Sequence, residues 1–406
     1  MSRVLVVLLM VVLVIGAVGL AQTPVTPRAA DGVLLFDNET GAEVLRLGIL
    51  FDEPVTICKE DIVVFGGEAV TRLDMGARTA WIEAKVLPAG TLQVTYSGGA
   101  QVHSAYWAAT AQEKNKAIIR WSFETVWNGA DPSVASDFIS STAVVHGDGF
   151  VGELLGVEGS VGFGTTTRTA MPDMAFTVED LVAEVDMVLA RMSYTGTNTG
   201  PMFAVPPTGL PMTSKSMFIA RFSDGRIEEG WIQLDALGML IQLGLIPPMG
   251  APDYGWGIPS AVTGDPGTPE ANRILTSREP LEVWNEGNLD VIDEIIAEGF
   301  VGHYDMGNTV QGIEGFRQYV SNLLTAFPDF HVTVNELFAE NDLVVFQATA
   351  SGTNLGPFGP IPATGKPWQN TAIVVRRVAD GKIVELWQVG DMLSLLMQIG
   401  LVPPLQ

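Results

Sequence analysis

The side chains that could do chemistry in this chain occur in pairs that lie 156 or 157 positions apart. The pairs consist of a carboxylate, an indole and an imidazole: Asp235 and Asp391, Trp231 and Trp387, and His146 and His303. Carboxylates and imidazoles are the groups that most often transfer protons in enzymes. On a strand, alternate side chains share a face, so each aspartate is expected on the same face as the tryptophan four positions before it.

These pairs belong to a long internal repeat. Val126-Trp127-Asn128 recurs as Val283-Trp284-Asn285, and Asp224-Gly225 recurs as Asp380-Gly381. Many such matches at nearly constant spacing indicate two copies of one domain. Copy one is predicted over residues 113–249 and copy two over 270–406. Residues 250–269, which are rich in proline and glycine, are predicted to be a linker.

Each copy changes its hydrophobic period once. In copy two, apolar residues at three- and four-residue spacing before Pro328 predict a helix. Leu343–Ser351, Thr371–Val378 and Ile383–Val389 are β-branched and aromatic, and Asp380-Gly381 is a hairpin signal. Helices followed by a meander of strands predict an α+β fold of two tandem cone-shaped domains. Each cone would place helices on a curved antiparallel sheet and enclose a cavity.

Two segments precede the repeat. Residues 1–21 combine Arg3 with an uncharged apolar run and small residues before Gln22, which is typical of a secretory signal peptide. The chain is therefore expected to be secreted or periplasmic, or membrane-anchored if the signal stays uncleaved. Residues 31–107 predict a small antiparallel β-sandwich module that the repeats do not need for folding. Its predicted strands are Val33–Phe36, Ile62–Phe65, Ala80–Val86 and Thr91–Tyr96, with a turn at Pro88-Ala89-Gly90.

The composition argues against several classes of function. With 22 basic and 46 acidic residues among 406, the net charge is −24, which disfavours binding to nucleic acid or to anionic lipid. The single cysteine, Cys58, excludes an intrachain disulfide and a cysteine-rich metal site. Four histidines leave little for a zinc cluster, so no metal is expected. After signal cleavage, no stable membrane insertion is expected.

An ordered set of short motifs runs through both copies. In copy two they are Trp284-Asn285, His303, Pro328-Asp329, Gly352-Thr353, Asp380-Gly381, Glu385-x-Trp387-x-x-x-Asp391 and Gln398-Ile399-Gly400. Together they resemble the SnoaL-like polyketide cyclase family, whose members are also called ester cyclases and have a nuclear-transport-factor-2-like fold. The resemblance covers about two thirds of the chain, without the predicted signal and the β-rich module.

The resemblance implies a cofactor-free cyclase or isomerase acting on a polyketide-like molecule or a β-keto ester. An aspartate would remove a proton next to a carbonyl group, and the enolate would close a ring by an aldol reaction. The implied catalytic residues are Asp235, Asp391, His146 and His303, and the implied substrate-binding residues are Trp231, Trp387, Arg191 and Gln347. Asp235 is expected to be the better candidate for catalysis, because Arg191 offers a cation where enolate charge would develop, whereas its counterpart Gln347 is neutral.

Each implied site residue also has a structural explanation. Asp235 and Asp391 stand where a strand ends and a helical run begins, so a role as helix N-cap is as well supported as a role as base. The tryptophans fit a packed core at least as well as a ligand platform, and the histidines can be structural. The alternative function is therefore an extracellular binding protein for an apolar small molecule or a protein partner. The two copies are expected to pair as an intramolecular pseudo-dimer.

Overall fold

The computed structural model describes residues 25–403 except 31–32, 41–42, 54, 97–99, 130, 204, 248–255, 257–262, 306–307 and 360. The predicted signal peptide over residues 1–21 and most of the predicted linker over 250–269 lie outside the described residues. The chain divides into two compact units. The first contains the described residues up to Ser141 together with Phe222–Ile227, and the second contains Thr142–Arg221 and Glu228 onwards.

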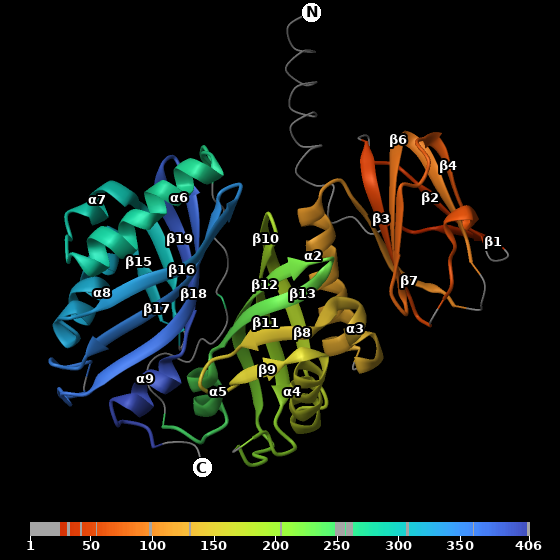
Figure 1. Ribbon diagram of the computed structural model, residues 1–406. Coiled ribbons are helices and arrows are strands. Elements are labelled where there is room, and N and C mark those ends of the chain that lie inside the picture. The colour runs from red at the N-terminus through yellow and green to blue at the C-terminus, as the bar shows by residue number, and fades with distance from the viewer. Residues whose placement is uncertain are drawn as a thin grey trace, which may run out of the picture. The chain divides into compact units, whose positions relative to one another are not determined.

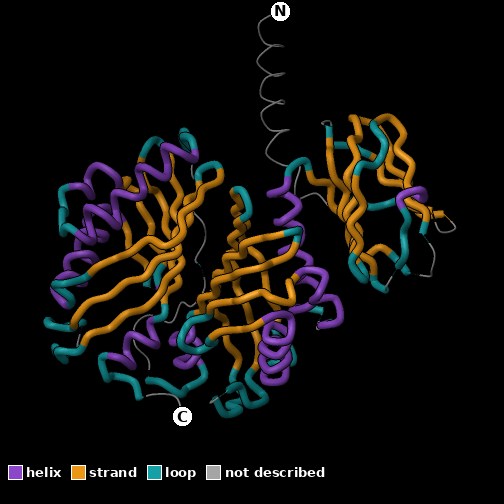
Figure 2. The backbone as a smooth tube through the Cα atoms, viewed as in Figure 1, coloured by secondary structure: helices purple, strands orange, loops and turns teal. Residues whose placement is uncertain are grey.

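Seven strands of the first unit are joined through one long strand, β6 (Figures 1 and 2). They are β1 (Arg28–Ala30), β2 (Val33–Asp37), β3 (Val44–Phe51), β4 (Ile62–Gly67), β5 (Arg72–Met75), β6 (Thr79–Thr95) and β7 (Val102–Ala108). A short 3-10 helix, η2 (Lys59–Asp61), precedes β4. The first part of β6 pairs with β3 and β5, and its last five residues pair with β2 and β4.

The predicted turn at Pro88-Ala89-Gly90 is a bend inside β6 rather than a break between two strands. Ala89 there has a φ of 61°, in the left-handed region that redirects a chain. The bend lets one strand serve two sets of partners. The buried core of this module includes Phe36, Leu47 and Trp107.

Helix α2 (Ala111–Trp121) packs on this module within the first unit. Trp121 at its C-terminal end is fully buried, with its ring centroid 5.1 Å from that of Trp81 and 5.7 Å from that of Tyr106. A chain beginning at Ala111 would lose both partners and expose Trp121 to water. The packing therefore argues against the expectation that the repeats fold without the module.

Copy one continues from α2 through three short helices into a six-stranded sheet. The helices are η3 (Ser122–Asn128, a π-helix), η4 (Pro132–Val134) and α3 (Ala135–Phe138). The strands are β8 (Ile139–His146), β9 (Glu153–Leu155), β10 (Ala175–Glu184), β11 (Met187–Thr197), β12 (Pro211–Ser223) and β13 (Arg226–Leu234), in the order β10-β11-β12-β13-β8-β9. Two further helices are α4 (Gly156–Ala170) and α5 (Ala236–Gln242).

Copy two lies wholly in the second unit and repeats this arrangement (Figure 1). Its helices are α6 (Pro269–Arg278), η5 (Glu279–Asn285, a π-helix), α7 (Val291–Ile295), α8 (Gly312–Ala326) and α9 (Met392–Gln398). Its strands are β14 (Ile296–His303), β15 (Thr309–Gln311), β16 (His331–Glu340), β17 (Leu343–Thr353), β18 (Pro367–Ala379) and β19 (Lys382–Gly390), in the order β15-β14-β19-β18-β17-β16.

The local signals in copy two are confirmed. Asp380 and Gly381 have φ values of 50° and 69°, as a two-residue hairpin turn between β18 and β19 requires. Phe316 and Val320 on α8 are fully buried against the sheet. One feature differs from the expected antiparallel sheet, because β14 pairs with β19 in parallel. β14 enters the sheet from a helix rather than through a hairpin, so its direction is not tied to that of β19.

A second apolar cluster of the second unit combines side chains of both copies. Its buried members are Val182, Met187, Leu189, Met217 and Ile219 of copy one, Trp256, and Phe338, Val345, Ile373, Val375, Trp387 and Val389 of copy two. The members from copy two lie on the sheet face opposite to the one that packs against α8. Within the described part of the chain, no helix is long and apolar enough to cross a membrane.

Candidate functional site

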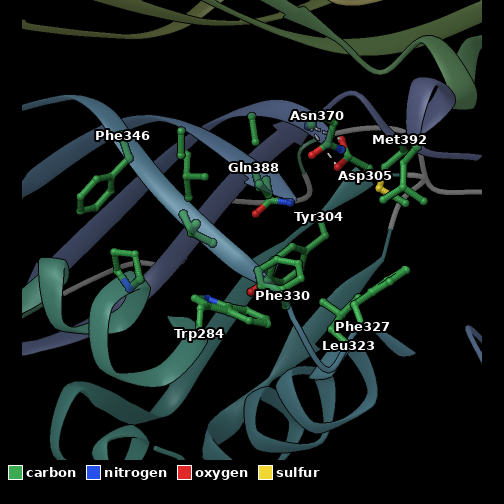
Figure 3. Close-up of a pocket in the computed structure, with 18 of the residues that line it drawn as sticks. Trp284, Tyr304, Asp305, Leu323, Phe327, Phe330, Phe346, Asn370, Gln388 and Met392 are labelled. Atoms are coloured by element: carbon green, nitrogen blue, oxygen red, sulfur yellow. Dashed lines mark hydrogen bonds between the residues drawn. The ribbon is translucent and has the colours of Figure 1, made fainter. Parts of the chain in front are cut away.

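A cavity of about 220 Å³ lies in copy two, between the helix-covered face of its sheet and the helices η5, α8 and α9 (Figure 3). Eight of its 25 lining residues are aromatic: Trp284, Tyr304, Tyr319, Phe327, Phe330, Phe346, Phe358 and Trp368. The polar side chains in the wall are few: Glu279, Asp305, Asn308, Asn370, Arg376 and Gln388. A concave, mostly apolar pocket with a few polar groups is the usual form of a small-molecule site.

The alternation of side chains along the strands decides which residues reach this cavity. On β19, Gln388 and Gly390 line it, whereas Trp387 and Val389 belong to the apolar cluster on the opposite face. On β18, alternate residues from Asn370 to Arg376 line the cavity. The strand carrying the Glu-x-Trp-x-x-x-Asp motif therefore points its tryptophan away from the cavity.

Asp305 is a buried carboxylate of the cavity wall, with 4% of its surface exposed. Its two oxygens both accept the backbone N–H of Gly390, at 3.1 Å each, and Gln388 also hydrogen-bonds to it. Burial raises the pKa of Asp305 to about 8, and the carboxylate of Asp235 in copy one adds to this rise. The Gly390 N–H, the Lys215 ammonium and Gln388 oppose it.

A buried ion pair forms another part of the wall. Arg376 donates from Nε to Glu279 Oε2, and the two side chains are only 6% and 3% exposed. Glu279 Oε1 accepts the indole N–H of Trp284 at 3.0 Å. The guanidinium lies over the ring of Phe346, 4.3 Å from its centroid. Glu279 thus fixes both Arg376 and Trp284 at the cavity.

Three buried donors of the cavity residues have no hydrogen-bond partner among the described residues: Tyr304 OH, Trp368 Nε1 and Arg376 Nη1. Burial raises the pKa of the Tyr304 phenol well above its usual value, so the hydroxyl keeps its proton and can donate. Buried donors are normally paired, and an unpaired one is unfavourable. A ligand with acceptor oxygens would satisfy them.

The residues of copy two implied by the resemblance lie outside this cavity lining. Asp391 caps α9, since its Oδ1 accepts Ser394 N at 2.9 Å, and its Oδ2 accepts Gly149 N of copy one at 2.8 Å. His303 is buried with Nε2 3.1 Å from Glu385 Oε1, and its ring centroid lies 5.9 Å from that of Trp387.

Gln347 Oε1 accepts the amide of Asn335 at 2.8 Å. Side chains alternate between the two faces along β17. Because the flanking Phe346 and Ala348 line the cavity, Gln347 lies on the opposite face. The structure therefore brings His303 and Trp387 together, but places neither Asp391 nor Gln347 beside a ligand site in copy two.

In copy one the implied residues have similar surroundings. Asp235 caps α5, with its Oδ1 accepting Gly238 N at 2.8 Å. His146 Nε2 lies 3.2 Å from Glu229 Oε1, and the His146 ring lies 5.9 Å from that of Trp231.

Arg191 is engaged with partners on both copies. Its Nε donates to Asp180 at 2.9 Å, and its guanidinium lies 4.6 Å from the ring centroid of Trp387 in copy two. The cation expected to stabilise an enolate is therefore held by Asp180 and by the indole of Trp387.

Sequence reasoning missed the three residues that give the cavity its chemistry: Tyr304, Asp305 and Arg376. Two signals could have found them. Asp305 follows His303 by two positions, and Asp148 follows His146 in the same way. Arg376 begins a charged pair directly after the apolar run 372–375 of a strand, where a buried charge needs a partner.

Copy one retains the aspartate but not its polar neighbours. Asp148 accepts the N–H groups of Phe150, Val151 and Leu234 at 2.9–3.0 Å. Burial raises the pKa of Asp148 to about 7, and the nearby Asp391 carboxylate contributes. The counterparts of the copy-two residues Glu279, Tyr304, Arg376 and Gln388 in copy one are Ser122, Gly147, Ala220 and Ile232.

Among the residues that the structure describes, no group of three or more histidine, cysteine, aspartate or glutamate side chains could hold a metal ion. The cavity wall itself supplies one carboxyl group of raised pKa, a guanidinium, and hydroxyl and indole donors.

Comparison with known proteins assigns both copies to the same family. The family model for SnoaL-like polyketide cyclases matches residues 117–243 and 275–399. No curated protein matches the chain.

Solved structures of single-repeat length are similar. A protein from Jannaschia sp. CCS1 assigned as a SnoaL-like polyketide cyclase is 29% identical over 34% of this chain and 95% of its own, with a TM-score of 0.32. IdmH from Streptomyces antibioticus, assigned as a polyketide cyclase, is 30% identical over 32% of this chain and 98% of its own, with a TM-score of 0.29. TsrD from Streptomyces laurentii is 26% identical over 33% and 97%, with a TM-score of 0.30.

Proposed function

Because this chain belongs to the SnoaL-like polyketide cyclase family, we propose that copy two is an enzyme domain of the cyclase or isomerase type. Its substrate is a small carbonyl compound, from which Asp305 removes a proton at the carbon next to the carbonyl group. The observation that carries the proposal is Asp305 itself, a buried carboxyl with a pKa of about 8 in an aromatic cavity. A base works best when its pKa lies near the working pH.

The proposed reaction uses only side chains of the cavity. The Asp305 carboxylate takes the proton, the C–H electron pair moves into the enolate, and the negative charge develops on the carbonyl oxygen. Tyr304 OH and Arg376 Nη1, which have no partner among the described residues, donate to that oxygen. The enolate carbon then attacks a second carbonyl and Asp305 returns the proton to the new alkoxide, or Asp305 returns it to another carbon.

Asp305 is proposed as the base in place of Asp235 and Asp391. The carboxylates of Asp235 and Asp391 each accept a backbone N–H as helix N-caps, and neither residue lines the cavity of copy two. A base must reach the proton that it removes, so position in the cavity decides between the candidates.

The volume of the cavity limits the substrate. An engineered cavity of about 150 Å³ binds benzene, so 220 Å³ suits a ligand of one or two rings. Carbonyl oxygens on this ligand would supply acceptors for the unpaired donors. A one-ring β-keto ester meets both conditions and also has an acidic C–H between its carbonyl groups.

The full chain is expected to catalyse exchange of that C–H for deuterium, followed by proton NMR with a panel of one- and two-ring β-keto esters. Because Asp305 must be deprotonated, the rate should rise about tenfold per pH unit below pH 8 and level off above it. Binding is followed in parallel through the fluorescence of Trp284 and Trp368 in the cavity wall. Ligand binding without exchange at any pH would favour the extracellular binding protein instead.

We also propose that the two copies pair through their outer sheet faces as an intramolecular pseudo-dimer. Support comes from the apolar cluster that contains side chains of both copies. Ion pairs at its edge add to it: Arg273 donates to Glu184 at 2.6 Å, and Arg221 Nη2 donates to Glu336 at 2.6 Å.

Charge reversal tests the pairing. Arg273→Glu is expected to lower the free energy of unfolding, since it places two carboxylates together, and Glu184→Arg in the same chain should restore part of the loss. The coupling between the two sites is expected at about 0.2–1 kcal/mol, because both side chains are partly exposed. Additive effects of the two changes would contradict the pairing.

We propose that residues 1–21 direct export and are removed before Gln22, on the strength of their sequence alone. N-terminal sequencing of the exported protein is expected to begin at Gln22. A retained Met1 would favour the membrane-anchored alternative.

A further inference from the structure

Lys215 on β12 of copy one is a buried cation beside the cavity of copy two. Only 1% of its surface is exposed, and its Nζ donates to the backbone carbonyl of Tyr304 at 3.0 Å. The ammonium also lies 5.4 Å from the ring centroid of Trp256. Burying a lysine is unfavourable unless its charge is compensated, so its presence next to Tyr304 and Asp305 calls for a role.

The groups that act on Asp305 come from both copies. Copy two contributes the Gly390 N–H, the side chain of Gln388 and the nearby phenol of Tyr319. Copy one contributes the two charged groups among these neighbours, Asp235 and Lys215. The carboxylate that we propose as the base therefore faces charges that its own domain does not supply.

The surroundings of the equivalent aspartate in copy one, Asp148, are different. Asp148 of copy one faces Asp391 of copy two, but the position equivalent to Lys215 in copy two is Thr371. Thr371 instead accepts the amide of Gln233 at 2.7 Å. In a homodimer both subunits would carry the same residues, whereas two copies fused in one chain can differ. Copy one has the lysine and lacks the polar cavity residues, whereas copy two has those residues and a threonine in place of the lysine.

We propose that Lys215 and Asp235 of copy one are positioning residues for Asp305 of copy two, so that copy one serves as the support of its partner's site. Lys215 holds the Tyr304 carbonyl, and hence the segment that carries Asp305, while its cation favours the Asp305 carboxylate. Asp235 lies beside Lys215, since its backbone N–H donates to the Lys215 carbonyl at 3.1 Å, and its charge disfavours the ionised Asp305 carboxylate by like-charge repulsion. This inference rests on the proposed function only for the choice of Asp305 as the base.

The ionisation of Asp305 is followed by ¹³C NMR over a range of pH, in the full chain labelled with ¹³C at the aspartate carboxyl groups. The Asp305 signal is identified by its loss in Asp305→Asn. Lys215→Thr, which introduces the residue that copy two carries, should raise the pKa of Asp305 by about 1 or more. Asp235→Asn should lower it, and asparagine keeps the acceptor that caps α5. Arg273→Met, which removes an ion pair between the copies that includes none of the groups acting on Asp305, should leave it unchanged.

A raised pKa of Asp305 in Lys215→Thr together with a lowered one in Asp235→Asn supports the inference. A purely structural disturbance gives no reason for shifts of opposite sign. Displacements of the same sign, or none, overturn it. If Lys215→Thr does not fold, Asp235→Asn alone decides: a fall in the pKa of Asp305 supports the proposal, and an unchanged value overturns it. Because the titration needs no substrate, its outcome is separate from that of the exchange assay, which tests the proposed function.

Discussion

Replacing Asp305 by asparagine is expected to slow deuterium exchange of a β-keto ester by about 10²–10⁴-fold, the usual contribution of a general base. Asparagine cannot take up the proton, but its carbonyl oxygen can still accept the Gly390 N–H that Asp305 accepts at 3.1 Å. The fold should therefore persist, which thermal melting checks. Binding of the ester, measured by tryptophan fluorescence, should change much less than the rate.

The matched control is Asp148→Asn, the same change at the equivalent position of copy one. It is expected to leave the exchange rate unchanged, because Gly147, Ala220 and Ile232 stand where copy two has Tyr304, Arg376 and Gln388. Its melting temperature will fall somewhat, since Asp148 accepts three backbone N–H groups that an amide cannot all satisfy. A loss of rate as large as that of Asp305→Asn would assign the chemistry to both copies.

The second large effect concerns stability. Arg376→Met is expected to lower the free energy of unfolding by about 3–5 kcal/mol, because it leaves the Glu279 carboxylate buried without its partner. Urea denaturation monitored by circular dichroism gives the change. Adding Glu279→Gln removes the unpaired charge, and glutamine still has an oxygen to accept the Trp284 N–H. The double variant should recover most of the lost stability.

Activity should not recover with stability. The double variant lacks the guanidinium N–H that we assign to the enolate oxygen, so its exchange rate should stay well below that of the wild type. Full recovery of the rate would remove Arg376 from the mechanism. An unchanged free energy of unfolding in Arg376→Met would show that the pair is not buried as described.

The fold of the repeats was predictable because its signals are local. The matches between the copies predicted the tandem repeat, which the family model matches in both copies, and Asp380-Gly381 predicted a hairpin whose φ values are those of the expected turn. The bend in β6 was not predictable in the same way. Pro88-Ala89-Gly90 has the composition of a turn, and only the pairing of one strand with two sets of partners shows that the strand continues.

The site was not predictable from the same motifs, because the sequence does not say which face of the sheet is covered by helices. Trp387 and Gln388 are neighbours, yet the first belongs to an apolar cluster on one face of the sheet and the second lines the cavity on the other. The tryptophan of the family motif therefore marks the face opposite to the cavity. The pKa of Asp305 depends on Gly390, Asp235 and Lys215, residues distant in sequence, so its chemistry emerges only in the fold.

The most direct test of the central claim is the crystal structure of the full chain with a one-ring β-keto ester bound. The account predicts the ester in the cavity of copy two, with its acidic carbon facing Asp305. At least one of its carbonyl oxygens should lie within hydrogen-bond distance of Tyr304 OH or Arg376 Nη1. An ester bound beside Asp235 and Trp231 of copy one, with the cavity of copy two unfilled, would contradict it.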